Sequence, residues 1–220
     1  MAFTGWPAEA FDLYAGLEAD NSRAYWQAHR DVYERAVKEP FAALSDAVER
    51  RFGPLRLFRP YRDTRFARDK SPYKTAAAAV TESEGGSAFY VQISAEGMFA
   101  GCGMYHMASD QLERWRAALD NGRAGAQVAR IADELRAQQY DVSAHDSLKS
   151  APRGYAKDHP RIDLLRMKGL TMGRQFPLAK WMHGPKAFDR IVGVWTDATP
   201  MNRWLERNVG PSTLPPAEPS

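Results

Sequence analysis

Apolar residues recur at helical spacing through the N-terminal third of the chain. Phe11, Tyr14 and Leu17 are three residues apart and form one stripe, which is typical of a helix with one face in a core. Two similar stripes follow, and Asn21 or Ser22 before the first of them is a suitable N-cap residue. The predicted helices cover residues 7–19, 22–37 and 40–52.

Short runs rich in β-branched and aromatic residues replace this pattern after residue 55. Residues 89–93 and 98–103 flank Ala95-Glu96-Gly97, and a glycine between two such runs predicts a β-hairpin. Together with strands expected earlier in the chain, this hairpin gives an antiparallel sheet of at least four strands. The other segments expected to be extended cover residues 56–61, 74–81, 140–150 and 170–176.

Helical periodicity returns in the second half of the chain, where Ser109 is predicted to cap a helix that carries Trp115 on its apolar stripe. The helices predicted here cover residues 110–121, 124–138, 186–195 and 200–209, with a short one after Pro160. We therefore expect an α+β fold, a single domain over residues 1–210 with a mainly antiparallel sheet covered by N-terminal and C-terminal helices. Residues 211–220 are rich in proline, have little to bury and are predicted to be a disordered tail.

Composition agrees with one globular domain. The 220 residues are 44% hydrophobic and 26% charged, which is ordinary for a folded domain of this length. Cys102 is the only cysteine, which excludes an intramolecular disulfide and multi-cysteine metal sites and fits a reducing compartment. The sequence lacks a signal-peptide pattern at its start and any apolar run near the roughly 20 residues that span a bilayer. We therefore expect a cytoplasmic protein with no membrane partner.

Positive charge is concentrated between Leu55 and Thr75. Seven cations stand against two carboxylates in these twenty-one residues, so the segment carries +5. Because the whole chain carries +3, the remaining residues sum to −2. The basic character is therefore local, and local charge of one sign attracts an anionic partner.

In one interpretation this segment binds an anion. Guanidinium groups offer planar forks to phosphate or carboxylate, lysines add point charges, and tyrosines supply faces for stacking. The candidate ligand-binding residues are Arg59, Tyr61, Arg62, Arg65, Lys70, Tyr73 and Lys74. Pro60 and Pro72 favour extended backbone, in which side chains three apart point to opposite faces. The arginines therefore cannot all line one groove: Arg59 and Arg65 would share one face and Arg56, Arg62 and Arg68 the other, unless a turn around Asp63-Thr64 breaks the strand.

Asp63 and Asp69 leave a second interpretation open, in which they neutralise arginines within a purely structural ion network. They are also weak candidates for acid–base chemistry or for holding Mg²⁺, although nearby arginines should lower both pKa values and favour a counter-ion role. His159 is a third weak catalytic candidate, although a role as a cap before the helix that follows Pro160 is the favoured explanation. We predict no metal site, and the sequence leaves any cofactor open.

The aromatic stripe on the second predicted helix also has two interpretations. Trp26 and Tyr33 are at the spacing of a core-facing helix, and burial alone explains them. Alternatively they form one wall of a ligand pocket, with Arg23 and His29 at its rim.

Residues 62–75 read R-D-T-R-F-A-R-D-K-S-P-Y-K-T. This run, with Phe58-Arg59 ahead of it, closely resembles the signature of domain-of-unknown-function family 2461. The similarity extends to other short motifs, namely residues 21–26, 101–105, 152–155 and 158–160. The resemblance covers nearly the whole chain and implies a shared fold, but it implies no activity, because none is established for the family.

Common nucleotide and protease motifs are absent from the sequence, including the phosphate-binding loop Gly-Lys-Ser/Thr, His-Glu-x-x-His and Gly-x-Ser-x-Gly. The first functional hypothesis is an enzyme or small-ligand binder for a molecule that bears a phosphate or carboxylate. The second is a nucleic-acid-binding module that places the same cations on phosphates and its aromatic residues on bases. The third is the structural ion network. A concave site where cations converge favours the small ligand, and a flat basic strip favours nucleic acid.

Overall fold

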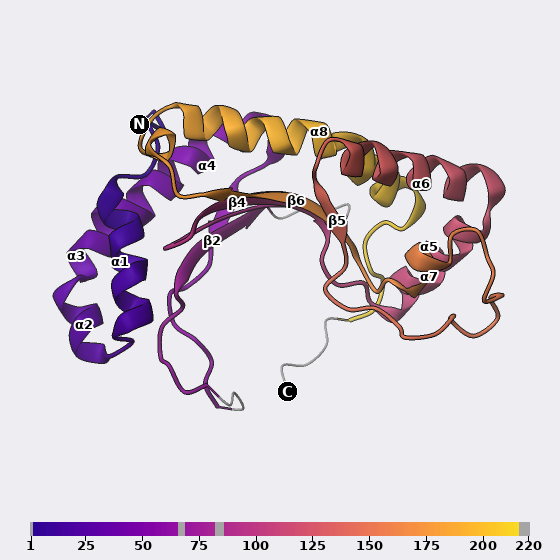
Figure 1. Cartoon of the computed structure of the whole chain (residues 1–220), viewed down its shortest axis with the longest axis horizontal. Coiled ribbons are helices and arrows are strands. Elements are labelled where there is room, and N and C mark those ends of the chain that lie inside the picture. The colour runs from indigo at the N-terminus through magenta and orange to yellow at the C-terminus, as the bar shows by residue number, and fades with distance from the viewer. Residues whose placement is uncertain (1, 66–68, 82–85, 216–220) are drawn as a thin grey trace. The chain divides into compact units, whose positions relative to one another are not determined.

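The computed structural model describes residues 2–65, 69–81 and 86–215. Six strands form one antiparallel sheet in the order β1-β2-β3-β4-β6-β5 (Figure 1). The strands are β1 (Leu55–Leu57), β2 (Ala76–Thr81), β3 (Ala88–Ser94), β4 (Gly97–Met104), β5 (Asp141–Ser143) and β6 (Leu170–Pro177). Helices precede and follow these strands in the chain, so the predicted α+β fold is confirmed.

The N-terminal helices are α1 (Ala8–Ala19), α2 (Arg23–Ala28), α3 (Arg30–Val32), the π-helix η1 (Tyr33–Lys38) and α4 (Glu39–Phe52). The later helices are α5 (Ser109–Asp120), α6 (Gly122–Ala137), α7 (Ile162–Arg166), the 3-10 helix η2 (Lys180–His183) and α8 (Lys186–Asn208). Among the residues that the structure describes, no helix is long and apolar enough to cross a membrane.

The chain forms two compact units. The first comprises Met1–Glu82, Phe89–Ala100 and Gln175–Val194, and the second comprises Ser83–Ala88, Gly101–Arg174 and Trp195–Ser220. The boundaries between them fall inside β3, β4, β6 and α8, so these four elements belong in part to each unit.

Pro40 starts a helix as predicted, whereas Pro200 does not. Pro40 lies in the first turn of α4, directly after η1. Pro200 lies inside α8, where Trp195 and Met201 on either side of it are fully buried. Burial of these neighbours holds a continuous helix across a residue that would end an isolated one.

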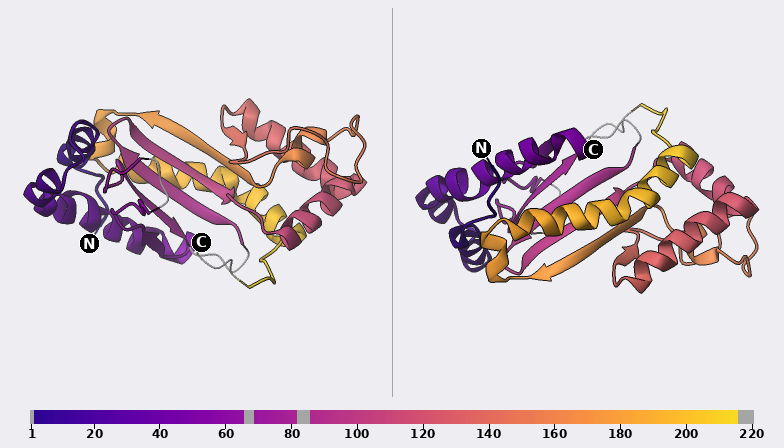
Figure 2. Two further views of the ribbon diagram at one scale, coloured as in Figure 1. Left: turned by 90° about the horizontal axis from the view of Figure 1, so that it is seen from below. Right: turned by 90° about the horizontal axis from the view of Figure 1, so that it is seen from above.

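In the first unit the sheet has one covered face. Ala79 of β2 lies between Leu57 and Val91 in the strand register, and Ala79 and Val91 are fully buried. α4 and the first part of α8 run along this face (Figure 2). The preceding residue, Ala78, pairs with Gln92 and points to the other face, because side chains alternate along a strand. Gln92 there is only half-buried.

The core of the second unit contains two tryptophans in edge contact. The ring centroids of Trp115 on α5 and Trp204 on α8 are 5.7 Å apart, with an angle of 89° between the rings. Each indole N–H donates to a backbone carbonyl: Trp115 to Leu164 (3.2 Å) and Trp204 to Ala124 (3.1 Å). The buried polar atoms of both side chains are therefore satisfied, as a well-packed core requires.

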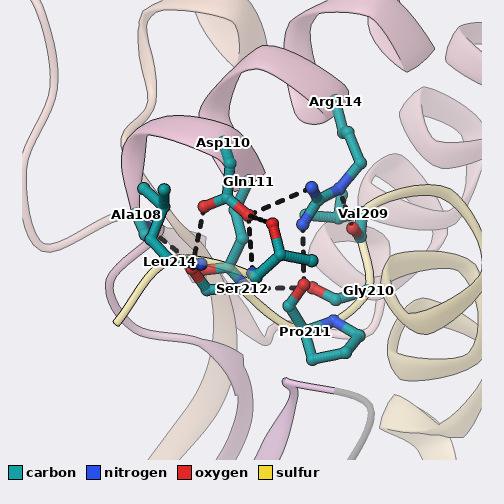
Figure 3. A network of polar contacts seen from close by, with 10 residues as sticks. Ala108, Asp110, Gln111, Arg114, Val209, Gly210, Pro211, Ser212 and Leu214 are labelled. Atoms are coloured by element: carbon teal, nitrogen blue, oxygen red, sulfur yellow. Dashed lines mark hydrogen bonds and ion pairs between the residues drawn. The ribbon is translucent and has the colours of Figure 1, made fainter. Parts of the chain in front are cut away.

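The segment after α8 is bound to the start of α5. The Asp110 carboxylate accepts hydrogen bonds from Ser212 Oγ (2.8 Å) and from the backbone N–H of Thr213 (2.9 Å) (Figure 3). Arg114, one turn along α5, donates to the carbonyls of Val209 and Pro211. Residues 211–214 therefore make polar contacts with α5 that composition did not reveal. Residues 216–220 lie outside the described part of the chain.

Ser109 is the first residue of α5 rather than its cap, and Ala108 flanks the helix. The N–H of Ala108 donates instead to the side chain of Gln111 (3.0 Å). The predicted hairpin of residues 89–93 and 98–103 is present as β3 and β4, with Gly97 at positive φ of 125°.

Candidate functional site

The cationic stretch forms an irregular hairpin between β1 and β2. Backbone hydrogen bonds join its arms from Phe58 N to Ala78 O (2.9 Å), from Arg62 N to Pro72 O (2.9 Å) and from Lys74 N to Pro60 O (2.8 Å). The regular strands are shorter than predicted, ending at Leu57 and beginning at Ala76. Pro60 and Pro72 explain the loss of regularity, because neither can donate to a strand ladder.

Tyr73, a predicted ligand residue, is a buried part of the hairpin with only 5% of its surface exposed. Its ring stacks on Trp26 of α2, with 4.7 Å between centroids and 17° between planes. The ring centroid of Tyr61, on the opposite arm, lies 5.5 Å from that of Tyr73. Tyr61 has 48% of its surface exposed. Tyr73 therefore has a packing role, whereas the exposed side chain of Tyr61 is accessible to a ligand.

A cavity of about 460 Å³ lies between the N-terminal helices and this hairpin. We call it the aromatic cavity. Its walls are mainly apolar and aromatic, and include Trp26, Tyr33, Phe41, Leu55, Leu57 and Tyr61. Its charged lining residues are Arg30, Glu34, Lys38 and Arg59.

The charges of the aromatic cavity are unbalanced. Three cations and one carboxylate line the cavity. The carboxylate belongs to Glu34, and its Oε2 forms an ion pair with Lys38 Nζ at 2.7 Å. Arg30 and Arg59 make no hydrogen bond or ion pair through their side chains within the described residues. Two positive charges are therefore in excess around a largely apolar space.

A second cavity, of about 310 Å³, lies on the other face of the sheet in the same unit. We call it the polar cavity. Arg62 and Lys74 line it, together with Gln92 and Tyr90 from β3. Ala79 lines the aromatic cavity and Ala78 lines the polar one, which places the two cavities on opposite faces of β2.

Apart from the buried Tyr73, which lines neither cavity, the predicted binding residues divide into three groups. Arg59 and Tyr61 line the aromatic cavity, and Arg62 and Lys74 line the polar cavity. Arg65 and Lys70 are exposed and line neither: Arg65 binds Asp63 at 2.7 Å, and Lys70 Nζ donates to the carbonyl of Thr64 at 2.9 Å. Arg68 lies outside the described residues.

Asp63 and Asp69 serve as local counter-ions. Hydrogen bonds from the side chain and backbone of Arg65 lower the pKa of Asp63 to about 2. Hydrogen bonds from Ser71, and then the Arg62 side chain, lower the pKa of Asp69 to about 2. Both carboxyls are ionised at neutral pH, so neither holds a proton for general-acid chemistry.

His159 lies in the second unit, at the turn before α7. Its Nδ1 accepts a hydrogen bond from the backbone N–H of Arg161 (3.0 Å), and its Nε2 is 3.4 Å from Asp120 Oδ1. These contacts fit the capping interpretation. In the part of the chain that is described, no three His, Cys, Asp or Glu residues are grouped so that they could hold a metal ion.

Sequence reasoning missed the helical side of the aromatic cavity. Arg30, Glu34 and Lys38 are four residues apart, so they follow one another along a single helical face. This spacing could have identified them as a group. Their position opposite Arg59 could not be inferred, because it depends on packing between segments distant in sequence.

The structure therefore defines a class: an α+β protein with a six-stranded antiparallel sheet and a cationic hairpin bordering an aromatic cavity. The family described as conserved hypothetical protein (DUF2461) matches residues 9–204, and the chain belongs to this family. Comparisons with curated proteins and with solved structures found no match.

Proposed function

We propose that the aromatic cavity binds a small molecule in which an apolar, ring-sized body carries a phosphate or carboxylate group. The observation that carries this proposal is the pairing of an aromatic lining with two arginines, Arg30 and Arg59, that have no ion-pair partner among the described residues. An apolar cavity with few charged groups is the usual form of a small-molecule site, and about 460 Å³ is within the usual range of volumes.

The apolar lining accounts for the body of the ligand. Trp26 is held in place on both sides, by the stack with Tyr73 and by Tyr33 at a centroid distance of 5.0 Å. A rigid aromatic wall loses little conformational entropy when a ligand packs against it. Removal of apolar surface from water then stabilises the complex by about 25 cal/mol per Å².

The arginines account for the charged group. A guanidinium offers two parallel N–H donors to phosphate or carboxylate, and such charge-assisted hydrogen bonds contribute about 1.5–3 kcal/mol each. Burial, with smaller effects from Glu34 and Tyr61, raises the pKa of Tyr33 to about 12. Its hydroxyl therefore keeps its proton at neutral pH and adds a donor to the lining.

Isothermal titration calorimetry with three probes tests the proposal. 1-Naphthyl phosphate has both an apolar ring system and a phosphate group. 1-Naphthol has the ring system alone, and inorganic phosphate has the anionic group alone. We expect Arg59→Ala to weaken 1-naphthyl phosphate binding about tenfold or more, which corresponds to about 1.4 kcal/mol, and to leave 1-naphthol binding nearly unchanged.

Arg65→Ala is the matched control, because it removes the same charge from the same hairpin outside the cavity. We expect it to change binding less than twofold. Equal losses in both variants, or no binding of 1-naphthyl phosphate by the folded protein, would refute the proposal. Preferential binding of a single-stranded oligonucleotide with a steep salt dependence would favour the nucleic-acid alternative.

A further inference from the structure

The polar cavity differs from the aromatic one in size and charge, and of its lining residues only Phe58 also lines the aromatic cavity. Its residues are Phe58, Arg62, Lys74, Thr75, Tyr90 and Gln92, with the alanines of β2 between them. Two are cations, and no carboxylate occurs among the described residues that line it. A small, polar space of this kind suits a compact anion rather than an aromatic body.

The hairpin brings the two cations to one face. The backbone N–H of Lys74 donates to Pro60 O, and that of Arg62 donates to Pro72 O, so the arms are paired at both positions. Lys74 lines the cavity together with Ala78 and Gln92, so the lysine lies on the face that carries Gln92. Arg59 lines the other cavity, so the two sites have separate cations.

Lys74 is the cation of this cavity without an acidic partner. Arg62 forms an ion pair with the exposed Asp69, whereas Lys74 has no carboxylate within ion-pair distance in the part of the chain that is described. Its ammonium lies instead 5.2 Å from the centroid of the Phe58 ring. Burial, and then repulsion from Arg59, lower the pKa of Lys74. Its positive charge is therefore uncompensated.

Gln92 adds a neutral donor. Tyr90 Oη donates to Gln92 Oε1 at 2.6 Å, so the amide oxygen already has a partner. This bond orients the side chain and leaves its NH₂ group to donate. Thr75, also in the lining, supplies a hydroxyl.

We propose that the polar cavity is a second anion site, which binds a phosphate or carboxylate group through Lys74, with Arg62 and the Gln92 amide as additional donors. A ligand of this site needs no apolar ring system. It is separate from the proposed function of the aromatic cavity, because its cations lie on the opposite face of the hairpin.

Inorganic phosphate and acetate are suitable probes, because they carry the charge without a body. Chemical-shift titration by NMR should place the largest perturbations at Lys74, Thr75 and Gln92. The pKa of Lys74 should rise when phosphate binds, since a bound anion stabilises the ammonium form. The Lys74 side-chain carbon shifts, followed against pH with and without phosphate, measure this change.

Lys74→Gln should weaken phosphate binding about tenfold or more, and Lys74→Arg should largely retain it. Lys70→Gln is the matched control: it removes one lysine charge from the same hairpin but outside both cavities, and should change binding less than twofold. Equal weakening by both glutamine variants, or no rise in the Lys74 pKa at saturating phosphate, would overturn the proposal. Retained 1-naphthyl phosphate binding by Lys74→Gln would show that the aromatic cavity acts independently.

Discussion

The Asn21 side chain binds both backbone polar groups of Tyr73, 52 residues further along the chain. Asn21 Oδ1 accepts from the N–H of Tyr73 at 2.9 Å, and Asn21 Nδ2 donates to its carbonyl at 3.2 Å. The amide thus satisfies the Tyr73 backbone where the hairpin is irregular and regular pairing is lost. It also fixes the start of α2 against the hairpin, which positions Trp26 and Tyr73 as one stacked pair beneath the aromatic cavity.

Asn21→Ala should therefore destabilise the protein by about 2 kcal/mol, because it leaves two backbone groups of a buried residue without partners. Chemical denaturation measures the free energy, and amide hydrogen exchange at Tyr73 should accelerate. Ser22→Ala is the control: it removes only the α2 cap bond to Tyr25 N (3.1 Å), should cost about 1 kcal/mol and should not affect exchange at Tyr73. Unchanged exchange in Asn21→Ala would contradict the role assigned to the amide.

The two hairpin carboxyls should respond differently to loss of their arginines. The Arg65 side chain makes the largest contribution to the low pKa of Asp63, whereas hydrogen bonds from Ser71 contribute more than Arg62 to that of Asp69. Arg65→Gln should consequently raise the pKa of Asp63 more than Arg62→Gln raises that of Asp69. NMR titration of the carboxyl carbons measures both values, and the reverse order would contradict the contacts described.

Asp63 and Asp69 should make the protein less stable at low pH. Asp63 and Asp69 have pKa values lowered from 3.8 to about 2 in the folded protein. Their contribution to stability is present above pH 4 and is lost as the pH falls through 2. The variants Asp63→Asn and Asp69→Asn should show a weaker loss of stability across this interval than the wild type.

Local features of the sequence were read correctly where local physics decides the structure. The strands around Glu96-Gly97 are an example, because a glycine turn and alternating residues specify the hairpin without distant contacts. Arg59 and Arg62 line different cavities, whereas the anion-binding interpretation grouped them. Pro40 was read correctly as a helix start. Pro200 was wrongly expected to start a helix, because the buried residues Trp195 and Met201 on either side of it preserve the continuity of α8.

The candidate site was predictable only in part. The cations of the hairpin were evident from charge density, but the aromatic cavity also needs Arg30 and Phe41, which come from separate helical segments. Their convergence depends on how α3 and α4 pack against β1. The contacts of residues 211–214 with α5 could not be predicted for a related reason, since Asp110 lies about one hundred residues earlier in the chain.

The glycine at the β3–β4 turn should tolerate no side chain. Gly97 has φ of +125°, and a Cβ there would lie 2.3 Å from Phe176 O and 2.6 Å from Leu178 N. Gly97→Ala should cost at least about 2 kcal/mol through backbone strain and overlap with immobile main-chain atoms. Gly193→Ala in α8 meets nothing within 4 Å and should instead stabilise by about 0.5–1 kcal/mol. Thermal unfolding of both variants tests this difference in sign.

Loss of Asp110 should release the segment after α8. In Asp110→Ala the backbone N–H of Thr213 loses its acceptor, as do the hydroxyls of Ser212 and Thr213. Amide exchange at Thr213 should increase severalfold while exchange in α6 stays unchanged. Asp133→Ala is the control, because it removes an exposed carboxylate that pairs with Arg136 on α6. Equal exchange at Thr213 in both variants would contradict the proposed attachment.

Tyr140 should make stability decline at high pH. Burial, followed by the hydrogen bond from its hydroxyl to Asp197 Oδ2 (2.5 Å), raises the pKa of Tyr140 from 10.0 to about 12. Because the pKa of Tyr140 is higher in the folded protein than in the unfolded chain, its phenol ionises at lower pH when the chain is unfolded. The contribution of Tyr140 to stability is therefore complete below pH 10 and is lost as the pH rises through 12.

The difference in unfolding free energy between wild type and Tyr140→Phe isolates this effect from other buried tyrosines. At neutral pH the variant should be less stable by about 1 kcal/mol, the usual contribution of one hydrogen bond, and the difference should shrink between pH 10 and 12. Asp197→Asn should lower the pKa of Tyr140 only partly, because burial is the larger cause and remains. A wild-type stability that falls no faster than that of Tyr140→Phe above pH 10 would show that the phenol is not held in its protonated form.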